Sequence, residues 1–244
     1  MRLISARHAV VVAILGLAFS CLLTMAAPGD GLKVGTLPVG KVVFLGNSIT
    51  LHGPAPSIGW TGDWGMAATS REKDYVHRLL DLIAKEAGGA PKAMIRNIAD
   101  FERNQTDFKT GEALKEELAF EPDVVILAIG ENAPSPKTDE ERRRFADALR
   151  DLLAQIHQHG HPRVFVRSEF WADAEKDRIL KKACDDAGGI YVDIEKLGAD
   201  PSNAARSERQ IEHAGVAAHP GDKGMSAIAD ALWQAIKQAG HAKP

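Results

Sequence analysis

The sequence predicts an α/β fold in which helices flank a parallel β-sheet. After residue 40, short runs of β-branched and other apolar residues alternate with longer amphipathic stretches, which is typical of βαβ units. The apolar runs are nearly continuous, as expected of strands that helices cover on both faces. The length of 244 residues and a hydrophobic content of 45% fit one globular domain.

Five strands are expected, each where apolar residues run together between polar or turn residues. Their lengths fit the short strands of an α/β domain, and each is separated from the next by enough chain for a helical crossover. The expected strands are residues 42–45, 93–97, 124–129, 164–166 and 190–192.

The stretches between these strands have the periodicity of amphipathic helices. Thr69 and Glu72 have the spacing of a capping box, which predicts the start of a helix. Thr138 and Glu141 predict a second helix start in the same way. The apolar faces comprise Val76, Leu79, Leu80, Ile83 and Ala87 in the first helix, Phe145, Leu149, Leu152, Leu153 and Ile156 in the second, and Met225, Ile228, Leu232 and Ile236 in a last helix.

The N-terminal residues 1–27 predict a secretory signal peptide. Arg2 and Arg7 precede an apolar stretch over residues 9–23, and small residues follow at suitable cleavage positions. An uncleaved membrane anchor stays open as an alternative, because the apolar stretch just reaches the required length. Residues 28–40 are expected to form a linker and residues 41–244 the folded domain. The protein is therefore expected to be periplasmic or secreted, without a membrane partner after signal cleavage.

The charge balance argues against a nucleic acid partner. The chain has 30 Lys and Arg against 33 Asp and Glu, and two of the arginines lie in residues 1–26, which leaves 28 against 33 after signal removal. A net negative protein repels phosphate backbones. Cys184 is the one cysteine after residue 26, so no disulfide can form within the mature chain.

Polar residues that could carry chemistry follow the carboxyl ends of the expected strands. Ser48 lies on a Gly-Asn turn after the first strand, and the segment 97–102 follows the second. Asn132 comes after the third strand, and His219 precedes the last helix. In an open parallel sheet, such segments meet beyond the carboxyl ends of the strands, where ligands bind.

Together these residue types can carry out acyl transfer. Ser48 supplies a hydroxyl nucleophile, and His219 supplies a base that can take its proton. Asn132 and the backbone N–H of Ser48 can donate hydrogen bonds to an oxyanion. His52 is close to Ser48 in the sequence and is a rival for the base. The alternative without chemistry is that Ser48 caps the next helix.

The same segments resemble the SGNH (GDSL-type) hydrolase family over residues 41–240. The resemblance implies a flavodoxin-like three-layer α/β/α sandwich with a five-stranded parallel sheet, and an esterase, lipase or carbohydrate deacetylase that works without a cofactor or metal. The segments that resemble the family's blocks are Gly46-Asn47-Ser48-Ile49-Thr50, Gly130-Glu131-Asn132, and His219-Pro220 followed by Gly224-Met225.

Two positions depart from the family pattern. In the second block, the family has a glycine whose backbone N–H binds the oxyanion; the matching residue is Glu102, whose backbone N–H inherits this expected role. The family has an aspartate three residues before the histidine, and Val216 occupies that position. A Ser-His dyad is then expected, with a backbone carbonyl near Val216, or the carboxylate of Glu212 or Glu131, holding the imidazole. Loss of catalysis is the alternative.

A loop rich in glycine and tryptophan after Ser48 suggests a carbohydrate substrate. Trp60 and Trp64 could stack on a sugar ring while Asp63 binds its hydroxyls. Trp171 and Glu131 are further substrate-binding residues expected at the same rim. The alternative is that the two tryptophans of the loop only pack it onto the domain.

These observations predict an exported serine esterase that hydrolyses carboxylic esters through an acyl-enzyme, and acetyl esters on carbohydrate are the expected substrates. The expected partner is a glycan or small-molecule ester. A lipid esterase, thioesterase or O-acyltransferase using the same site, or a non-catalytic glycan-binding module, are the alternatives.

Overall fold

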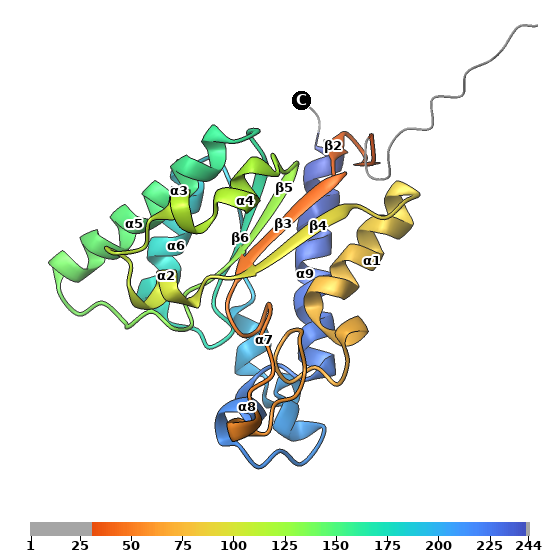
Figure 1. Ribbon diagram of the computed structural model, residues 1–244, viewed down its shortest axis with the longest axis vertical. Helices are drawn as coiled ribbons and strands as arrows, with labels where there is room; N and C mark the ends of the chain where they lie inside the picture. The colour runs from red at the N-terminus through yellow and green to blue at the C-terminus, as the bar shows by residue number, and fades with distance from the viewer. Residues whose placement is uncertain (1–30, 243–244) are drawn as a thin grey trace, which may run out of the picture.

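The computed structural model describes residues 31–242 and contains a five-stranded parallel sheet, as predicted (Figure 1). Each expected strand is present, with ends that differ by at most one residue. Across the sheet the order is β4-β3-β5-β6-β7. The strands are β3 (Lys41–Gly46), β4 (Lys92–Asn97), β5 (Val124–Ala128), β6 (Arg163–Arg167) and β7 (Ile190–Val192).

The strand order brings two functional loops together. From β3 the chain moves outward to β4 and then crosses to β5 on the other side of β3. β3 and β5 are therefore neighbours, with Gly46 in register with Ala128. The loops after these two strands leave in opposite directions, and such a switch point opens a crevice at the carboxyl edge of a parallel sheet.

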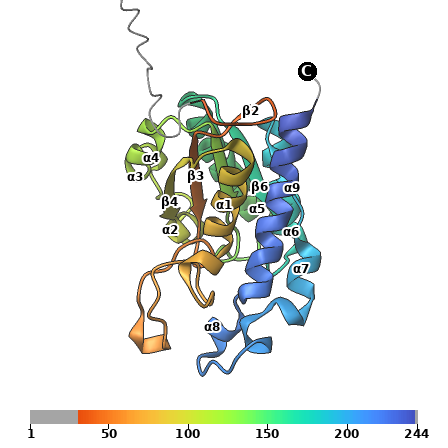
Figure 2. The same cartoon turned by 90° about the vertical axis from the view of Figure 1, so that its right-hand side faces the viewer.

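Helices cover both faces of the sheet and complete the three-layer sandwich (Figures 1 and 2). One layer contains α1 (Tyr75–Ala87) and α9 (Asp222–His241), which pack against each other. The opposite layer contains α5 (Asp139–Gln158) and α6 (Ala174–Asp186). The short helices are α2 (Ala99–Arg103), α3 (Thr110–Ala113), α4 (Lys115–Ala119), α7 (Glu195–Ala199) and α8 (Ala214–Ala218), with 3-10 turns η1 (Pro56–Ile58), η2 (Arg71–Lys73), η3 (Pro201–Asn203) and η4 (Ala205–Ser207).

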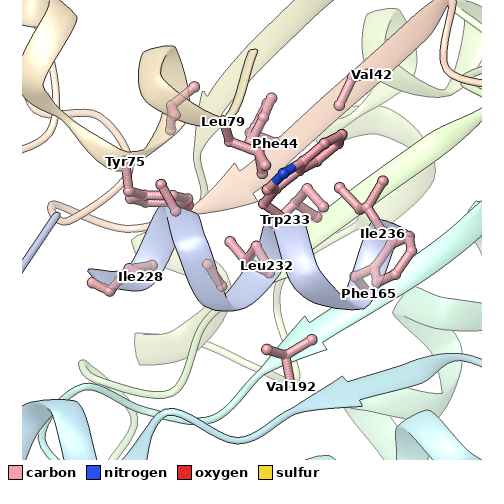
Figure 3. Close-up of a cluster of buried hydrophobic side chains, with 14 of the residues drawn as sticks. Val42, Phe44, Tyr75, Leu79, Phe165, Val192, Ile228, Leu232, Trp233 and Ile236 are labelled. Atoms are coloured by element: carbon pink, nitrogen blue, oxygen red, sulfur yellow. The ribbon is translucent and has the colours of Figure 1, made fainter. Parts of the chain in front are cut away.

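Two apolar clusters, one on each face, hold the layers together. On the α9 face, Leu232 and Ile236 pack with Phe44 and Phe165 of the sheet (Figure 3). On the other face, Leu45 belongs to the cluster formed with α5 and α6. Neighbouring residues of β3 thus point to opposite faces and are buried on both, which explains its unbroken apolar sequence.

One of the two predicted helix caps is correct. The Thr138 capping box at the start of α5 is present. The predicted cap at Thr69 is wrong, because residues 71–73 form a 3-10 turn and α1 begins at Tyr75. The buried Asp74 carboxylate caps α1 by accepting from the backbone N–H of His77 at 2.8 Å. Thr69 instead donates its hydroxyl to Asp222.

The expected linker is part of the folded domain from residue 31 onward, which corrects the prediction for 31–40. β1 (Lys33–Val34) and β2 (Leu37–Pro38) form an antiparallel hairpin. Val34 is fully buried, and the N–H of Thr36 donates to the Gly240 carbonyl of α9 at 2.7 Å. The expected signal peptide lies outside the described residues. Across residues 31–242, the structure contains no helix with the length and hydrophobicity needed to span a membrane.

Candidate active site

Ser48 lies on a tight turn at the carboxyl end of β3. The side-chain oxygen of Asn47 accepts from the N–H of Ile49, and its backbone carbonyl accepts from the N–H of Thr50. A side chain at Gly46 would collide with the Thr50 hydroxyl, so the close turn requires glycine there. These contacts fix the backbone on which Ser48 is presented.

His219 reaches Ser48 from the other end of the chain. It follows α8 and precedes α9, and its Nε2 lies 2.8 Å from Ser48 Oγ. Its Nδ1 lies 2.8 Å from the backbone carbonyl oxygen of Gly215. A carbonyl can only accept, so Nδ1 carries the ring proton and the unprotonated Nε2 faces the serine. This tautomer is the one a general base requires.

A backbone carbonyl therefore occupies the place that an aspartate would take. Val216, at the aspartate position, is buried in an apolar cluster with Trp60 and Met66. The Gly215 carbonyl, one residue earlier, holds the imidazole, which agrees with the first of the alternatives expected from the sequence. The Glu131 carboxylate is engaged elsewhere, and Glu212 lines a neighbouring cavity.

Burial favours the neutral form of the His219 imidazole. His219 is 9% exposed. This burial lowers the pKa of His219 below its ordinary value of 6.5, against the opposing effects of the Gly215 carbonyl and the Glu131 charge. At neutral pH the ring is therefore available to accept a proton.

Ser48, His219 and Asn132 line one cavity of about 470 Å³. The three residues come from loops after β3 and β5 and from the turn before α9, so the switch point of the sheet does bring them together. The remaining lining residues are His52, Ile58, Met66, Asn97, Ala99, Asp100, Arg103, His213, Gly215 and Val216.

Asn132 is held from two sides. Its side-chain Nδ2 donates to the Glu102 carboxylate, and its Oδ1 accepts from Arg103 Nη2 at 3.4 Å. The Glu102 side chain is fully buried, while Ala99, Asp100 and Arg103 are the residues of α2 that line the cavity. The Glu102 carboxylate thus points away from the cavity, and the oxyanion role of its backbone N–H stays a prediction.

The family model of GDSL-like lipases and acylhydrolases matches residues 44–227. The chain belongs to this family. The resemblance found in the three sequence blocks is thereby confirmed, and the protein is a GDSL-type esterase. A comparison with curated proteins gave no match.

Solved structures of similar fold are distant in sequence from this esterase. A protein assigned as a GDSL-like lipase from Bacteroides ovatus has a TM-score of 0.54 and 14% identity, with 82% of this chain and 99% of that chain covered. A family two carbohydrate esterase from Clostridium thermocellum, solved with cellohexaose, has a TM-score of 0.51 and 13% identity, with 82% of this chain and 64% of that chain covered. At these identities the likeness shows the fold alone, and it confirms the predicted three-layer sandwich.

Glu131 of the esterase is a buried structural carboxylate rather than a residue at the cavity wall. Its side chain is 2% exposed and pairs with Arg167 at 2.6 Å. It also accepts from the N–H of Phe170 and from Asn47 Nδ2. Although burial opposes it, the Arg167 guanidinium lowers the pKa of Glu131 below its usual value. A substrate-binding role for Glu131 does not fit this burial.

The two tryptophans of the loop after Ser48 pack mainly against protein. Trp60 is buried and meets Trp64 edge to face, with ring centroids 5.6 Å apart. Each indole N–H donates to a backbone carbonyl of the same loop. The loop and α8 project beyond the same end of the sheet (Figure 2). Both tryptophans line a second cavity of about 780 Å³, which shares Ile58, His213 and Val216 with the Ser48 cavity. The Asp63 side chain is exposed.

Trp171 lies beside the serine and histidine. Its ring contacts the His219 imidazole edge to face at 4.9 Å, and its indole N–H donates to the Ala218 carbonyl. At 37% exposed, it is the most exposed large hydrophobic side chain within residues 31–242. Trp171 therefore has a free ring surface next to the reacting groups.

Sequence reasoning missed several residues of the cavity. Arg103 directly follows the segment 97–102, and its charge could have drawn attention to it. His213 lines the cavity and accepts from the N–H of Val216 at the start of α8. The described residues contain no group of three or more His, Cys, Asp or Glu placed to bind a metal.

Proposed function

We propose that this GDSL-type esterase is an exported enzyme that removes acetyl groups from carbohydrate through a Ser-His acyl-enzyme mechanism. The observation that carries the proposal is the hydrogen-bonded series from the Gly215 carbonyl through His219 to Ser48. Two contacts of 2.8 Å orient a neutral base toward a hydroxyl, which is the arrangement that nucleophilic catalysis needs.

In the proposed reaction, Ser48 Oγ attacks the ester carbonyl carbon while His219 Nε2 accepts the hydroxyl proton. The carbonyl oxygen becomes an oxyanion, which Asn132 Nδ2 and the backbone N–H of Ser48 stabilise by hydrogen bonds. Collapse of the intermediate breaks the bond to the alcohol, which leaves with the proton from His219. Water then attacks the acyl-serine, again with His219 as base, and releases acetate and free Ser48.

The polarity of the cavity supports a hydroxyl-rich alcohol and a short acyl group. Imidazole, amide, carboxylate and guanidinium groups form much of its lining, which suits hydroxyls better than an alkyl chain. Trp171 offers an exposed ring next to His219, and the apolar face of a sugar can pack on such a ring. A carbohydrate esterase is among the proteins that share the fold. Export rests on the N-terminal arginines and the apolar stretch after them.

A comparison of acyl chains tests this proposal. We expect the purified chain to hydrolyse p-nitrophenyl acetate with a higher kcat/KM than p-nitrophenyl octanoate, and to release acetate from an acetylated oligosaccharide. The Ser48→Ala variant is the control. A preference for octanoate would favour a lipid esterase instead, and glycan binding without acetate release would favour a binding module.

The pH dependence of the reaction should report on His219. Only the neutral ring can accept a proton, so kcat/KM should rise with pH as the imidazole loses its proton. Because burial lowers the pKa of His219, the acid limb should have its midpoint below 6.5. The measurement is kcat/KM for p-nitrophenyl acetate from acidic to neutral pH. The rival base is tested with His52→Ala. The His52 charge makes a minor contribution to the lowered pKa of His219, so this variant should move the midpoint only slightly upward. A wild-type midpoint above 6.5 would contradict the assignment.

A further inference from the structure

Glu102 joins the three loops that follow β3, β4 and β5. It belongs to α2, directly after β4, and its side chain is 0% exposed. One partner, Asn47, precedes the nucleophile Ser48, and the others, Gly130 and Asn132, lie in the loop after β5. A single carboxyl group is thus buried between the segments that carry the nucleophile and the oxyanion donor.

Four N–H groups point at this carboxyl group. Oε1 accepts from Asn47 Nδ2 at 3.0 Å and from the backbone N–H of Gly130. Oε2 accepts from the backbone N–H of Asn132 at 3.2 Å and from its side-chain Nδ2. An ionised carboxylate can accept all four bonds, whereas the O–H of a carboxylic acid would face an N–H donor. The surroundings are therefore built for the charged form.

The charged groups around Glu102 come from α2, from the loop after β5 and from β6. Glu131 shares the Asn47 amide with it, at 2.6 Å from Nδ2, and pairs with Arg167 of β6. Burial and the Glu131 charge raise the pKa of Glu102, while its N–H donors oppose this shift. Arg103 lies on the cavity side of Asn132. Arg167 forms its ion pair with Glu131, so the four N–H donors are the groups that contact the Glu102 carboxylate directly and stabilise its negative charge.

These contacts determine how the Asn132 amide is oriented. Glu102 requires an N–H donor at its position, and the Arg103 guanidinium requires an acceptor. Nδ2 must therefore face Glu102 and Oδ1 must face Arg103, as observed. Within the described part of the chain, Glu102 is the one acceptor of Nδ2, so its second N–H bond is available to an oxyanion.

We propose that Glu102 is a positioning residue, whose buried carboxylate orients the Asn132 side-chain amide so that it donates a hydrogen bond to the oxyanion. This inference depends on the proposed esterase mechanism and adds a role that acts through Asn132. It gives Glu102 a function that does not involve contact with the substrate.

A double-mutant cycle tests whether Glu102 affects catalysis through Asn132. Glu102→Gln keeps the size of the side chain but places an amide N–H against the existing donors. We expect kcat for p-nitrophenyl acetate to fall by about 10²-fold, as for loss of one oxyanion donor, with KM nearly unchanged. In the Asn132→Ala background, the same substitution should change kcat by no more than about twofold. Equal losses in both backgrounds would overturn the proposal.

Glu169→Gln is the matched control. Glu169 is also a buried glutamate at this edge, paired with Lys176 at 2.6 Å. Burial raises the pKa of Glu169 to about 8, so an amide resembles its form at neutral pH. We expect this variant to keep wild-type kcat within about threefold, because its partner is a lysine and not the oxyanion donor. A loss as large as that of Glu102→Gln would also overturn the proposal.

The NMR signals of the Asn132 side-chain amide give a second, activity-independent measurement. In the wild-type protein, the Nδ2 protons should exchange slowly with solvent, and in Glu102→Gln they should exchange faster. Fast exchange in the wild type would refute the proposal, even if the variant does not fold. If the wild type shows no Ser48-dependent turnover, the esterase mechanism fails, and these signals still decide whether Glu102 orients Asn132.

Discussion

Replacing Ser48 with alanine is expected to lower kcat/KM for p-nitrophenyl acetate by about 10⁴-fold or more, as for removal of a nucleophile from other serine hydrolases. The alanine has no atom that can attack the ester or donate to His219. The Ser48 side chain lies on a turn held by Asn47, so the substitution should leave the fold intact. Circular dichroism and thermal unfolding check that the fold is intact. The release of p-nitrophenol, followed in a continuous or a stopped assay, measures the activity.

His219→Ala should cause a loss of similar size, because the two residues act as one unit. The double variant should therefore be hardly worse than either single variant. His52→Ala is the comparison that separates the two histidines: it lines the cavity, but its Nδ1 contacts the Gly53 carbonyl instead of Ser48. A Ser48→Ala variant with activity close to wild type would refute the assigned nucleophile. If His52→Ala lost all activity while His219→Ala stayed active, His52 and not His219 would be the general base.

The elements that the sequence predicted correctly are those whose signal is local. The strands β3 and β5 are buried on both faces, so their apolar runs are visible without knowledge of the fold. The α5 cap is also local, since Thr138 and Glu141 are three residues apart. The α1 cap was misassigned because Thr69 has the same local pattern, while the choice of Asp74 depends on its burial against the Gly65 N–H.

The candidate site shows the same division between local and distant contacts. Ser48, Asn132 and His219 could be chosen from the sequence because each follows a strand or precedes a helix in a typical motif. The partner of His219 is a backbone carbonyl, and any residue could supply one, so no residue type marks Gly215. The side-chain contacts of Glu102 could not be predicted for a related reason, because its donors belong to two other loops. Such contacts depend on the packing of loops that are far apart in sequence.

The buried ion pair beneath the site should have the largest effect on stability. Arg167 and Glu131 have side chains that are 0% and 2% exposed, with 2.6 Å between Nη1 and Oε1. Replacing Arg167 with methionine leaves the Glu131 carboxylate buried without its cation and close to Glu102. We expect the free energy of unfolding, measured with urea, to fall by about 3–5 kcal/mol at neutral pH, as for other broken buried pairs.

The dependence of this loss on pH distinguishes an uncompensated charge from poor packing of the methionine. In the wild type, Arg167 lowers the pKa of Glu131, so the pair stabilises the fold at neutral pH and this contribution decreases as the pH falls. Without Arg167, burial should raise the pKa of Glu131, and protonation at mildly acidic pH should then recover part of the lost stability. The double variant Arg167→Met with Glu131→Gln should recover stability at neutral pH as well, because it removes the charge. A deficit that stays the same at every pH and in the double variant would mean that the guanidinium acts through its packing and its bond to the Ser168 carbonyl, and not through the charge of Glu131.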